Sequence, residues 1–312
     1  MLKIDDLGKC FGLGTAGLSG NAGGYSFGEV KEDDAVGVIR KAKEVFGVKV
    51  FDTAPIYGFG EAENRLGKAI QENREDFFVV TKTGVGWHSN KRVNMTNCPK
   101  HTKKMLEDSM RRLGTDYVDA VLVHWPDSNV DIRKTYEVLA KAKMEGKVRY
   151  IGLSNTNKEE IKFAKEVDSI DMIQGECNIF NKTELMSLDE NNEFYKTSWG
   201  SFDKGIATGR VYKNRVFDSS DCRSWAPWWK KSGKDQKINK VKLLSEKIST
   251  DNNSLKEEFL VKFSIETIKR SGVQCPFFGV KNEFDLNSLG KLFHANLDDY
   301  PVVKDLLKGN DV

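Results

Sequence analysis

Proline and cysteine are both scarce in this 312-residue sequence. With only six prolines, the chain has no long proline-rich linker. The five cysteines are odd in number, lie far apart and never form a Cys-x-x-Cys pair, which argues against a disulfide framework and against a zinc knuckle. We expect them to be reduced thiols. The four histidines have no metal-ligand spacing either, so the sequence predicts no metal site.

Long apolar runs and a large excess of charge of one sign are also missing. No stretch approaches 18 uncharged apolar residues, and the first residues, MLKIDD, lack the apolar core of a signal peptide. The 49 basic and 46 acidic residues are interspersed and leave a net charge of +3, so no global field favours nucleic acid or a membrane surface. The sequence predicts a cytoplasmic protein that binds neither nucleic acid nor membrane and holds any anionic ligand by local contacts.

The length is compatible with two ordinary domains or with one large α/β barrel. Short β-branched runs alternate with segments of helical periodicity through the first half of the chain. The predicted strands are 48–54, 77–82, 117–124, 148–154 and 170–176, and the predicted helices are 31–46, 61–71, 99–113, 131–145 and 157–167. Strands separated by helices of this length pair in parallel through crossovers. Five consecutive units without a linker favour one (β/α)8 TIM barrel of class α/β over two domains.

Several of these helices carry specific end signals. Gly47, Gly114 and Gly146 each follow a predicted helix, at the place where a left-handed residue ends it. Asn157, with Glu160 three residues later, predicts a capping box at the start of another. These signals support the predicted element boundaries.

The second half of the chain repeats the alternation less clearly. The predicted elements are a weak strand at 194–199, a better strand at 276–280, and helices at 238–248 and 254–270 between them. Residues 212–240 are predicted to be an irregular, tryptophan-rich loop near the cofactor or substrate site, whose Trp225, Trp228 and Trp229 either shape a pocket or clamp the loop. The lysines toward its end indicate a solvated face. We predict one barrel domain over residues 1–312, with a long loop and helical insertion before the last strand.

Polar residues end the predicted strands, where a parallel barrel carries its reactive groups. They are Asp52, Lys82, His124, Ser154 with Asn155, and Gln174 with Glu176. Taken alone, such residues have structural explanations. Lys82 can reach solvent, Asp52 can cap a helix, and His124 can be a buried residue whose ring nitrogens are hydrogen-bonded. Together they predict a functional site, because charges of both signs at one barrel mouth cost desolvation free energy and are uncommon as a stabilising device.

The segments that contain these residues resemble the aldo-keto reductase superfamily. They are GLGTAGL at 12–18, FDTAPIYGFGEAENRLGKAI at 51–70, VVTKTG at 79–84, RRLGTDYVDAVLVHWPD at 111–127, GKVRYIGLSN at 146–155 and QGECN at 174–178, with a fainter match in SWGSFDKGIATGRVY at 198–212 and PFFGVKNEFDL at 276–286. They follow the family's order and near-family spacing. The resemblance implies a barrel enzyme that uses a nicotinamide dinucleotide to reduce an aldehyde, ketone or aldose carbonyl to the alcohol, or to catalyse the reverse.

The same resemblance implies four catalytic residues. Tyr57 is the proton donor, and because a free tyrosine is a poor acid at neutral pH, Lys82 is expected to lower its pKa. Asp52 would pair with Lys82 and fix its position. His124 would hydrogen-bond the substrate oxygen and orient the carbonyl.

Further residues are implied to bind the cofactor. Their positions are Thr15 near the cofactor, Asp52, the carboxamide-binding Ser154, Asn155 and Gln174, the ring-stacking Trp199, Ser201 to Gly205 with Arg210 along the pyrophosphate, and Lys281 at a 2′-phosphate. Lys281 favours NADPH, with NADH as the alternative. The glycines of GLGTAG precede no dinucleotide-type helix, so they do not predict a phosphate loop.

Two positions depart from the family pattern. Cys177 stands where the family often has tyrosine, which affects packing more than chemistry. Residues 287–289 match the family's adenine-binding positions poorly. A barrel that has lost its cofactor is therefore one alternative, and an NADPH-binding regulatory barrel with little turnover is another.

The expected substrate is a small carbonyl compound or a sugar. Trp87, His88 and Trp125 are predicted to line its pocket. The protein is expected to be a monomer or a small homo-oligomer.

Overall fold

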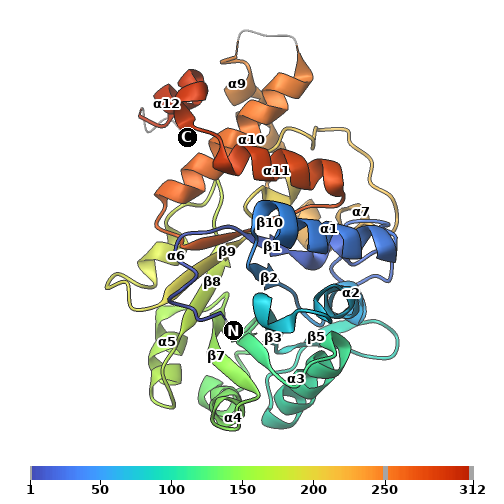
Figure 1. Ribbon diagram of the computed structural model, residues 1–312, viewed down its shortest axis with the longest axis vertical. Helices are drawn as coiled ribbons and strands as arrows, with labels where there is room; N and C mark the ends of the chain where they lie inside the picture. The colour runs from blue at the N-terminus through green and yellow to red at the C-terminus, as the bar shows by residue number, and fades with distance from the viewer. Residues whose placement is uncertain (1, 249–251, 309–312) are drawn as a thin grey trace.

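A computed structural model describes residues 2–248 and 252–308. Eight parallel strands close into a barrel in the order β1-β10-β9-β8-β7-β6-β3-β2 (Figure 1). Their bounds are β1 Gly12–Gly14, β2 Val50–Asp52, β3 Phe78–Thr83, β6 Val118–Val123, β7 Val148–Ser154, β8 Met172–Glu176, β9 Tyr195–Trp199 and β10 Cys275–Gly279. The predicted (β/α)8 barrel is confirmed, and the weak strand predicted at 194–199 is a full member of the sheet.

The helices predicted in the first half are all present. They are α1 Glu32–Phe46, α2 Glu61–Ile70, α3 Pro99–Leu113, α4 Ile132–Met144 and α5 Lys158–Lys165. Helices α1 and α3 end at Gly47 and Gly114, whose φ angles of 63° and 64° are the left-handed conformation that glycine adopts without strain. Helix α5 begins with the predicted capping box of Asn157 and Glu160. The glycine and capping-box patterns therefore predicted these helix ends correctly.

Two hydrophobic layers hold the barrel together. Alternate strand residues such as Val80 and Leu122 point inward and fill the barrel, whereas Val79 and Val121 pack outward beneath the helices. This alternation follows from the two-residue period of a strand. Because both faces are covered, β3 and β6 are buried along their whole length.

The segment between β9 and β10 is more regular than predicted. Residues 212–240 contain α7 Cys222–Trp225 and α8 Pro227–Lys230, and α9 Lys234–Ser245 begins four residues before the predicted helix start. The expectation of an irregular loop was therefore wrong from Cys222 onward, whereas residues 212–221 form neither helix nor strand. The local signals were present in the sequence, because the Asp221 side chain caps α7 and Pro227 occupies the first turn of α8.

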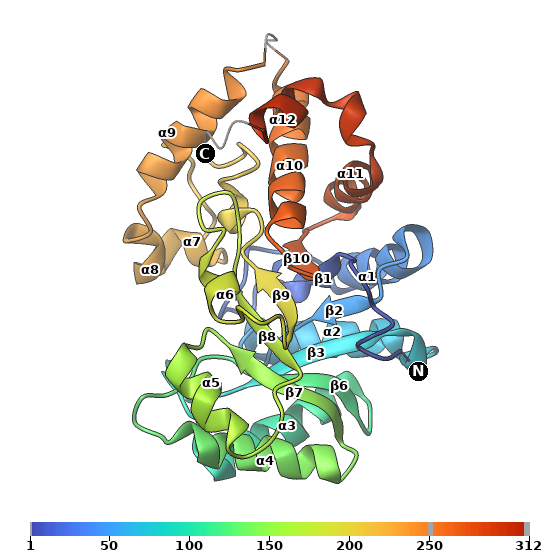
Figure 2. The ribbon, with the colours of Figure 1, turned by 90° about the vertical axis from the view of Figure 1, so that its left-hand side faces the viewer.

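The remaining elements surround this framework. They are the hairpin of β4 Val85–Trp87 and β5 Val93–Met95, the short α6 Glu184–Ser187, and the later helices α10 Asn253–Arg270, α11 Glu283–His294 and α12 Pro301–Leu306. Helices α9, α10 and α12 lie together on the side of the barrel away from α3 and α4 (Figures 1 and 2). That residues 1–312 form one domain stays a prediction, and the ends of that range lie outside the described residues.

Candidate active site at the carboxyl ends of the strands

The inward-facing series of four strands ends in polar side chains. Val50 in β2 is followed two residues later by Asp52, and Met172 in β8 by Gln174. In the same way Val80 in β3 leads to Lys82, and Leu122 in β6 leads to His124. Because side chains on a strand alternate between faces, each of these residues points into the barrel mouth.

Lys82 and Asp52 form a buried ion pair at the centre of this mouth. Lys82 Nζ donates to Asp52 Oδ1 at 2.6 Å and to the Thr53 carbonyl oxygen at 3.0 Å. The two charged side chains are only 1% and 4% exposed. Gln174 Nε2 also donates to Asp52 Oδ1, at 2.9 Å. These contacts hold the ammonium group in one position.

Tyr57 approaches the ion pair from the loop that follows β2. Lys82 Nζ donates to the Tyr57 hydroxyl oxygen at 3.4 Å. The Tyr57 ring stands nearly perpendicular to the His124 ring, with centroids 6.0 Å apart. The structure therefore brings the four predicted catalytic residues, Asp52, Tyr57, Lys82 and His124, to one place.

The pKa of Tyr57 differs from the sequence prediction in direction. Burial raises it well above its ordinary value of 10.0, and the Asp52 carboxylate raises it further. The expected net lowering of this pKa is not found, because burial of the phenol and the neighbouring Asp52 carboxylate both disfavour the tyrosinate. Tyr57 is thus a protonated phenol at neutral pH.

The pKa values of His124 and Lys82, two further groups at this mouth, are shifted mainly by burial. Burial lowers the pKa of His124 well below 6.5, and the nearby Lys82 charge lowers it further. His124 is therefore neutral at physiological pH and can donate one ring N–H. Burial also lowers the pKa of Lys82, a shift that Asp52 opposes.

A chain of hydrogen bonds connects the predicted carboxamide-binding residues. Ser154 Oγ donates to Gln174 Oε1 at 3.2 Å, and Asn155 Nδ2 donates to the His124 carbonyl oxygen at 2.8 Å. Trp199 Nε1 donates to Asn155 Oδ1 at 2.9 Å. The chain joins the ends of β7, β8 and β9 beside the ion pair.

Two other predicted cofactor residues are part of the barrel wall. Thr15 Oγ1 donates to the Asp52 carbonyl oxygen at 3.0 Å, and Ser201 Oγ donates to that of Phe277 at 2.7 Å. Both residues are buried. Their hydroxyl groups therefore form hydrogen bonds between neighbouring parts of the barrel wall.

A cavity of about 960 Å³ opens above these residues and extends to the end of β10. Its lining includes Asp52, Tyr57, His124 and the predicted pocket residue Trp125. The other two predicted pocket residues are not part of this lining. Trp87 packs against Phe59 with ring centroids 5.3 Å apart, and His88 is exposed to solvent.

The predicted phosphate-binding cations line the far part of the cavity. Arg210 Nε donates to Glu257 Oε1 at 2.6 Å, and its guanidinium group also binds Asp285. Lys281 Nζ donates to the Phe27 carbonyl oxygen at 2.6 Å. Both cations already have partners, so an anionic ligand must compete with these contacts or add to them. Gly205 lies in the same wall.

Comparison with known proteins identifies the family. The aldo/keto reductase family model matches residues 11–304, nearly the whole chain. The chain therefore belongs to the aldo/keto reductase family.

It is an oxidoreductase of that family, whose members bind nicotinamide cofactors. It is 28% identical over 304 residues to the aldo-keto reductase YhdN of Bacillus subtilis, an alignment that covers 95% of this chain and 89% of the relative. It is 28% identical over 221 residues to the NADH-specific methylglyoxal reductase of Escherichia coli, covering 66% and 67%. A solved glycerol dehydrogenase of Gluconobacter oxydans superposes with a TM-score of 0.74 at 26% identity, covering 95% and 90%.

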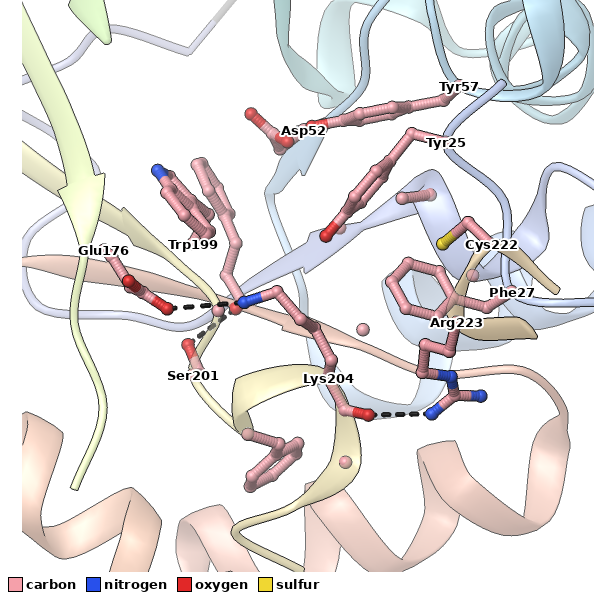
Figure 3. Close-up of a pocket in the computed structure, with 18 of the residues that line it drawn as sticks. Tyr25, Phe27, Asp52, Tyr57, Glu176, Trp199, Ser201, Lys204, Cys222 and Arg223 are labelled. Carbon is pink, nitrogen blue, oxygen red and sulfur yellow. Dashed lines mark hydrogen bonds and ion pairs between the residues drawn. The ribbon is translucent and has the colours of Figure 1, made fainter. Parts of the chain in front are cut away.

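This aldo/keto reductase has a second polar cluster in its cavity, centred on Lys204, which the sequence analysis included only within the range Ser201 to Gly205. Lys204 Nζ donates to Asp203 Oδ1 at 3.1 Å and to Glu176 Oε1 at 3.4 Å. It lies 5.4 Å from the ring centroid of Trp199 and 5.8 Å from that of Trp228. Figure 3 shows Lys204 reaching toward Glu176 and Trp199 from below Tyr25.

The charge of Lys204 is retained although the side chain is nearly buried. Burial opposes the charged form, but Tyr25, Asp203 and Glu176 together raise the pKa of Lys204 above its ordinary value. The Lys204 carbonyl oxygen also accepts a hydrogen bond from Arg223 Nη1 at 2.7 Å, which brings a second cation to this wall (Figure 3). Lys204 lies within the segment 198–212 that matched the family faintly, and this was the signal that pointed to it.

Residues 2–248 and 252–308 lack two features. Within them no helix is long and apolar enough to cross a membrane. The same residues contain no group of three or more side chains suited to hold a metal ion.

Proposed function

We propose that this aldo/keto reductase reduces the carbonyl group of a small aldehyde, ketone or aldose to the alcohol, or catalyses the reverse, with NADPH or NADH. One observation carries the proposal: a phenol, an ammonium and a carboxylate are buried in contact at the wall of a large cavity, beside a neutral imidazole. Burying such groups costs free energy of folding. The arrangement therefore indicates a functional site rather than a device that stabilises the fold.

The residues present fit a nicotinamide dinucleotide. One end of the cavity has the amides of Asn155 and Gln174, and its other walls have the cations Lys204, Arg223 and Lys281. Amide groups suit a carboxamide, and separate cations suit a diphosphate and a further phosphate. When bound, the nicotinamide supplies or accepts the hydride.

We assign the proton chemistry to Tyr57. Its hydroxyl group gives a proton to the oxygen that develops negative charge, and Lys82 at 3.4 Å stabilises the tyrosinate that is left. Asp52 keeps the Lys82 ammonium in position. The neutral His124 donates its ring N–H to the substrate oxygen and so orients the carbonyl.

The cavity also suggests a class of substrate. The cavity lining combines the Glu176 carboxylate with the partly exposed aromatic rings of Trp125 and Trp228, a combination suited to a molecule with several hydroxyl groups and an apolar face. The Gluconobacter relative is named as a glycerol dehydrogenase, which also suggests a polyol. We therefore include glyceraldehyde, glycerol and aldoses among the first substrates to test, with methylglyoxal.

A titration and a turnover assay test the proposed function together. Because Trp199 and Trp228 line the cavity, NADPH or NADH should quench or shift the tryptophan fluorescence on binding. Turnover is then measured with the carbonyl compounds and alcohols named above. Binding with measurable turnover is the expected result. Binding without turnover would instead favour a regulatory barrel, and absence of binding would indicate a barrel that has lost its cofactor.

We assign the choice between the two cofactors to Lys281. Its ammonium group is the cation we place at the adenosine 2′-phosphate, and the assignment favours NADPH. Replacing Lys281 with methionine should weaken NADPH binding by about 10- to 100-fold, the range for a lost hydrogen bond to a charged group, and leave NADH binding unchanged. The fluorescence titration measures both affinities, and NADH is the internal control. Equal losses for both cofactors would contradict the assignment.

The pKa directions predict an unusual pH profile for reduction. Tyr57 must be protonated to act as an acid, and its pKa lies well above 10, so the rate should not fall as the pH rises toward 9. The pKa of His124 lies well below 6.5, so the rate should not change near pH 6.5 either. We expect kcat/KM for reduction to be flat between about pH 6 and pH 9. A titration near pH 6.5 that disappears in His124→Gln would contradict the neutral imidazole.

A further inference from the structure

Two cysteines lie at the seam where the first and last strands close the barrel. Cys10 precedes β1 and Cys275 begins β10, and these strands pair in parallel with Gly12 opposite Phe277. The backbone N–H of Cys10 donates to the Gln274 carbonyl oxygen at 3.1 Å, which extends the pairing to the cysteines. They lie at the amino-terminal end of the barrel, at the opposite end from the candidate active site.

The sulfur atoms of Cys10 and Cys275 are already in contact. Their separation is 3.4 Å. Residues in register on neighbouring strands have Cα atoms about 4.8 Å apart, which lies inside the range of about 4.4 to 6.8 Å that disulfides span. A bond of about 2.05 Å therefore requires side-chain rotation and small backbone adjustments rather than separation of the strands. The other partly exposed thiol, Cys98, instead contacts His101.

The two thiols differ in a way that suits stepwise oxidation. Cys10 is partly exposed to solvent, whereas Cys275 is buried. The contact with the Cys275 thiol lowers the pKa of Cys10 against the opposing effect of burial, and Lys49 adds to the lowering. Burial raises the pKa of Cys275. Cys10 is thus the accessible nucleophile, and Cys275 is the protonated thiol beside it.

We propose that Cys10 and Cys275 form a reversible disulfide when the protein meets a peroxide. The Cys10 thiolate attacks one peroxide oxygen, the O–O bond breaks, and the hydroxide that leaves takes up a proton as water. The Cys275 sulfur then attacks the sulfenic sulfur of Cys10, and the S–OH bond breaks. That hydroxyl leaves as water with the Cys275 proton. Two thiols and one hydrogen peroxide become one disulfide and two waters, and a dithiol reverses the change.

The disulfide would join two distant parts of the chain. Ile4 and Leu7, which precede Cys10, pack in the same apolar cluster as Phe78 and Met172 at the barrel interior. The Tyr195 hydroxyl group donates to the Gly8 carbonyl oxygen at 3.0 Å and holds this segment beside the cysteines. A bond from Cys10 to Cys275 would therefore lock the closing seam and constrain the unfolded chain.

The test is oxidation of the full-length protein with a small excess of hydrogen peroxide, followed by thiol counting in denaturant and peptide mapping by mass spectrometry. We expect two of the five thiols to be lost, a cross-linked peptide joining Cys10 to Cys275, and full recovery with dithiothreitol. The midpoint of thermal unfolding should rise by about 5 °C in the oxidised protein.

Three cysteine variants show which thiols form the disulfide. Cys10→Ser and Cys275→Ala should each abolish the cross-link and the thermal shift, whereas Cys98→Ser should behave like the parent protein. If one of the first two fails to fold, the other and the peptide map still decide. Five thiols that remain free after oxidation, or a cross-link between other cysteines, would overturn the proposal.

Discussion

Replacing Tyr57 with phenylalanine should lower kcat for carbonyl reduction by about 10²- to 10⁴-fold, the usual contribution of a general acid. The variant removes one oxygen atom, the acceptor of the 3.4 Å contact from Lys82, and keeps the ring that packs against His124. Affinity for the cofactor should therefore stay within about twofold of the parent value. Steady-state kinetics and the fluorescence titration measure the two quantities separately.

Tyr25→Phe is the matched control for this variant. Tyr25 lies in the same cavity, with its ring centroid 5.8 Å from that of Tyr57, and it is buried enough that its pKa is raised. It has no hydrogen bond from Lys82 among the described contacts, and its hydroxyl group is directed toward Lys204 instead (Figure 3). We expect only a modest change in kcat. A Tyr57→Phe variant with near-normal activity, or a Tyr25→Phe variant with the larger loss, would refute the assignment of the acid.

Replacing Lys82 with methionine should have the largest combined effect on stability and activity. It leaves Asp52 buried without its cation, and breaking a buried pair in this way costs about 3 to 5 kcal/mol of unfolding free energy. It also removes the charge that stabilises the Tyr57 tyrosinate, so kcat should fall by about 10²-fold or more. Denaturant unfolding and steady-state kinetics give the two values.

A second substitution separates the structural part from the chemical part. Adding Asp52→Asn to Lys82→Met removes the unpaired buried charge and keeps an oxygen that can accept from Gln174. The double variant should recover part of the lost stability, whereas its kcat should stay low. Recovery of both stability and activity would mean that the pair serves folding alone.

Lys196→Met is a control drawn from the same barrel. Lys196 Nζ donates to Asp189 Oδ2 at 2.6 Å, and both side chains are 1% exposed, so this pair matches Lys82 and Asp52 in burial and distance. It lies outside the cavity lining. We expect a similar loss of stability and a nearly unchanged kcat. If both lysine variants lose kcat equally, the activity loss at Lys82 follows from destabilisation.

Local patterns predicted the first half of the barrel well because they act over only a few residues. The two-residue alternation of β3 and β6 and the glycines after α1 and α3 express steric rules within one element. The prediction was weaker for β9, whose five residues include a buried lysine that is paired with Asp189. Such a partner cannot be inferred from the strand's own residues.

The same limit applies to the candidate site. The positions of Asp52, Lys82 and His124 followed from strand ends, but the direction of the Tyr57 pKa shift depends on how deeply the phenol is buried and on the Asp52 carboxylate beside it. Trp87 belongs to the short strand β4, where it packs against Phe59 rather than lining the cavity. The pairing of Arg210 with Glu257 and Asp285 joins residues far apart in the chain.

By itself, the sequence determined the class of fold and which side chains end the strands, because hydrophobic period and turn chemistry are local. Only the tertiary structure decided which of those side chains meet, which charges neutralise one another, and where Lys204 and the two seam cysteines lie. The physical reason is that electrostatic and sulfur chemistry depends on distances of a few ångströms between distant parts of the chain, and those distances are set when the barrel closes.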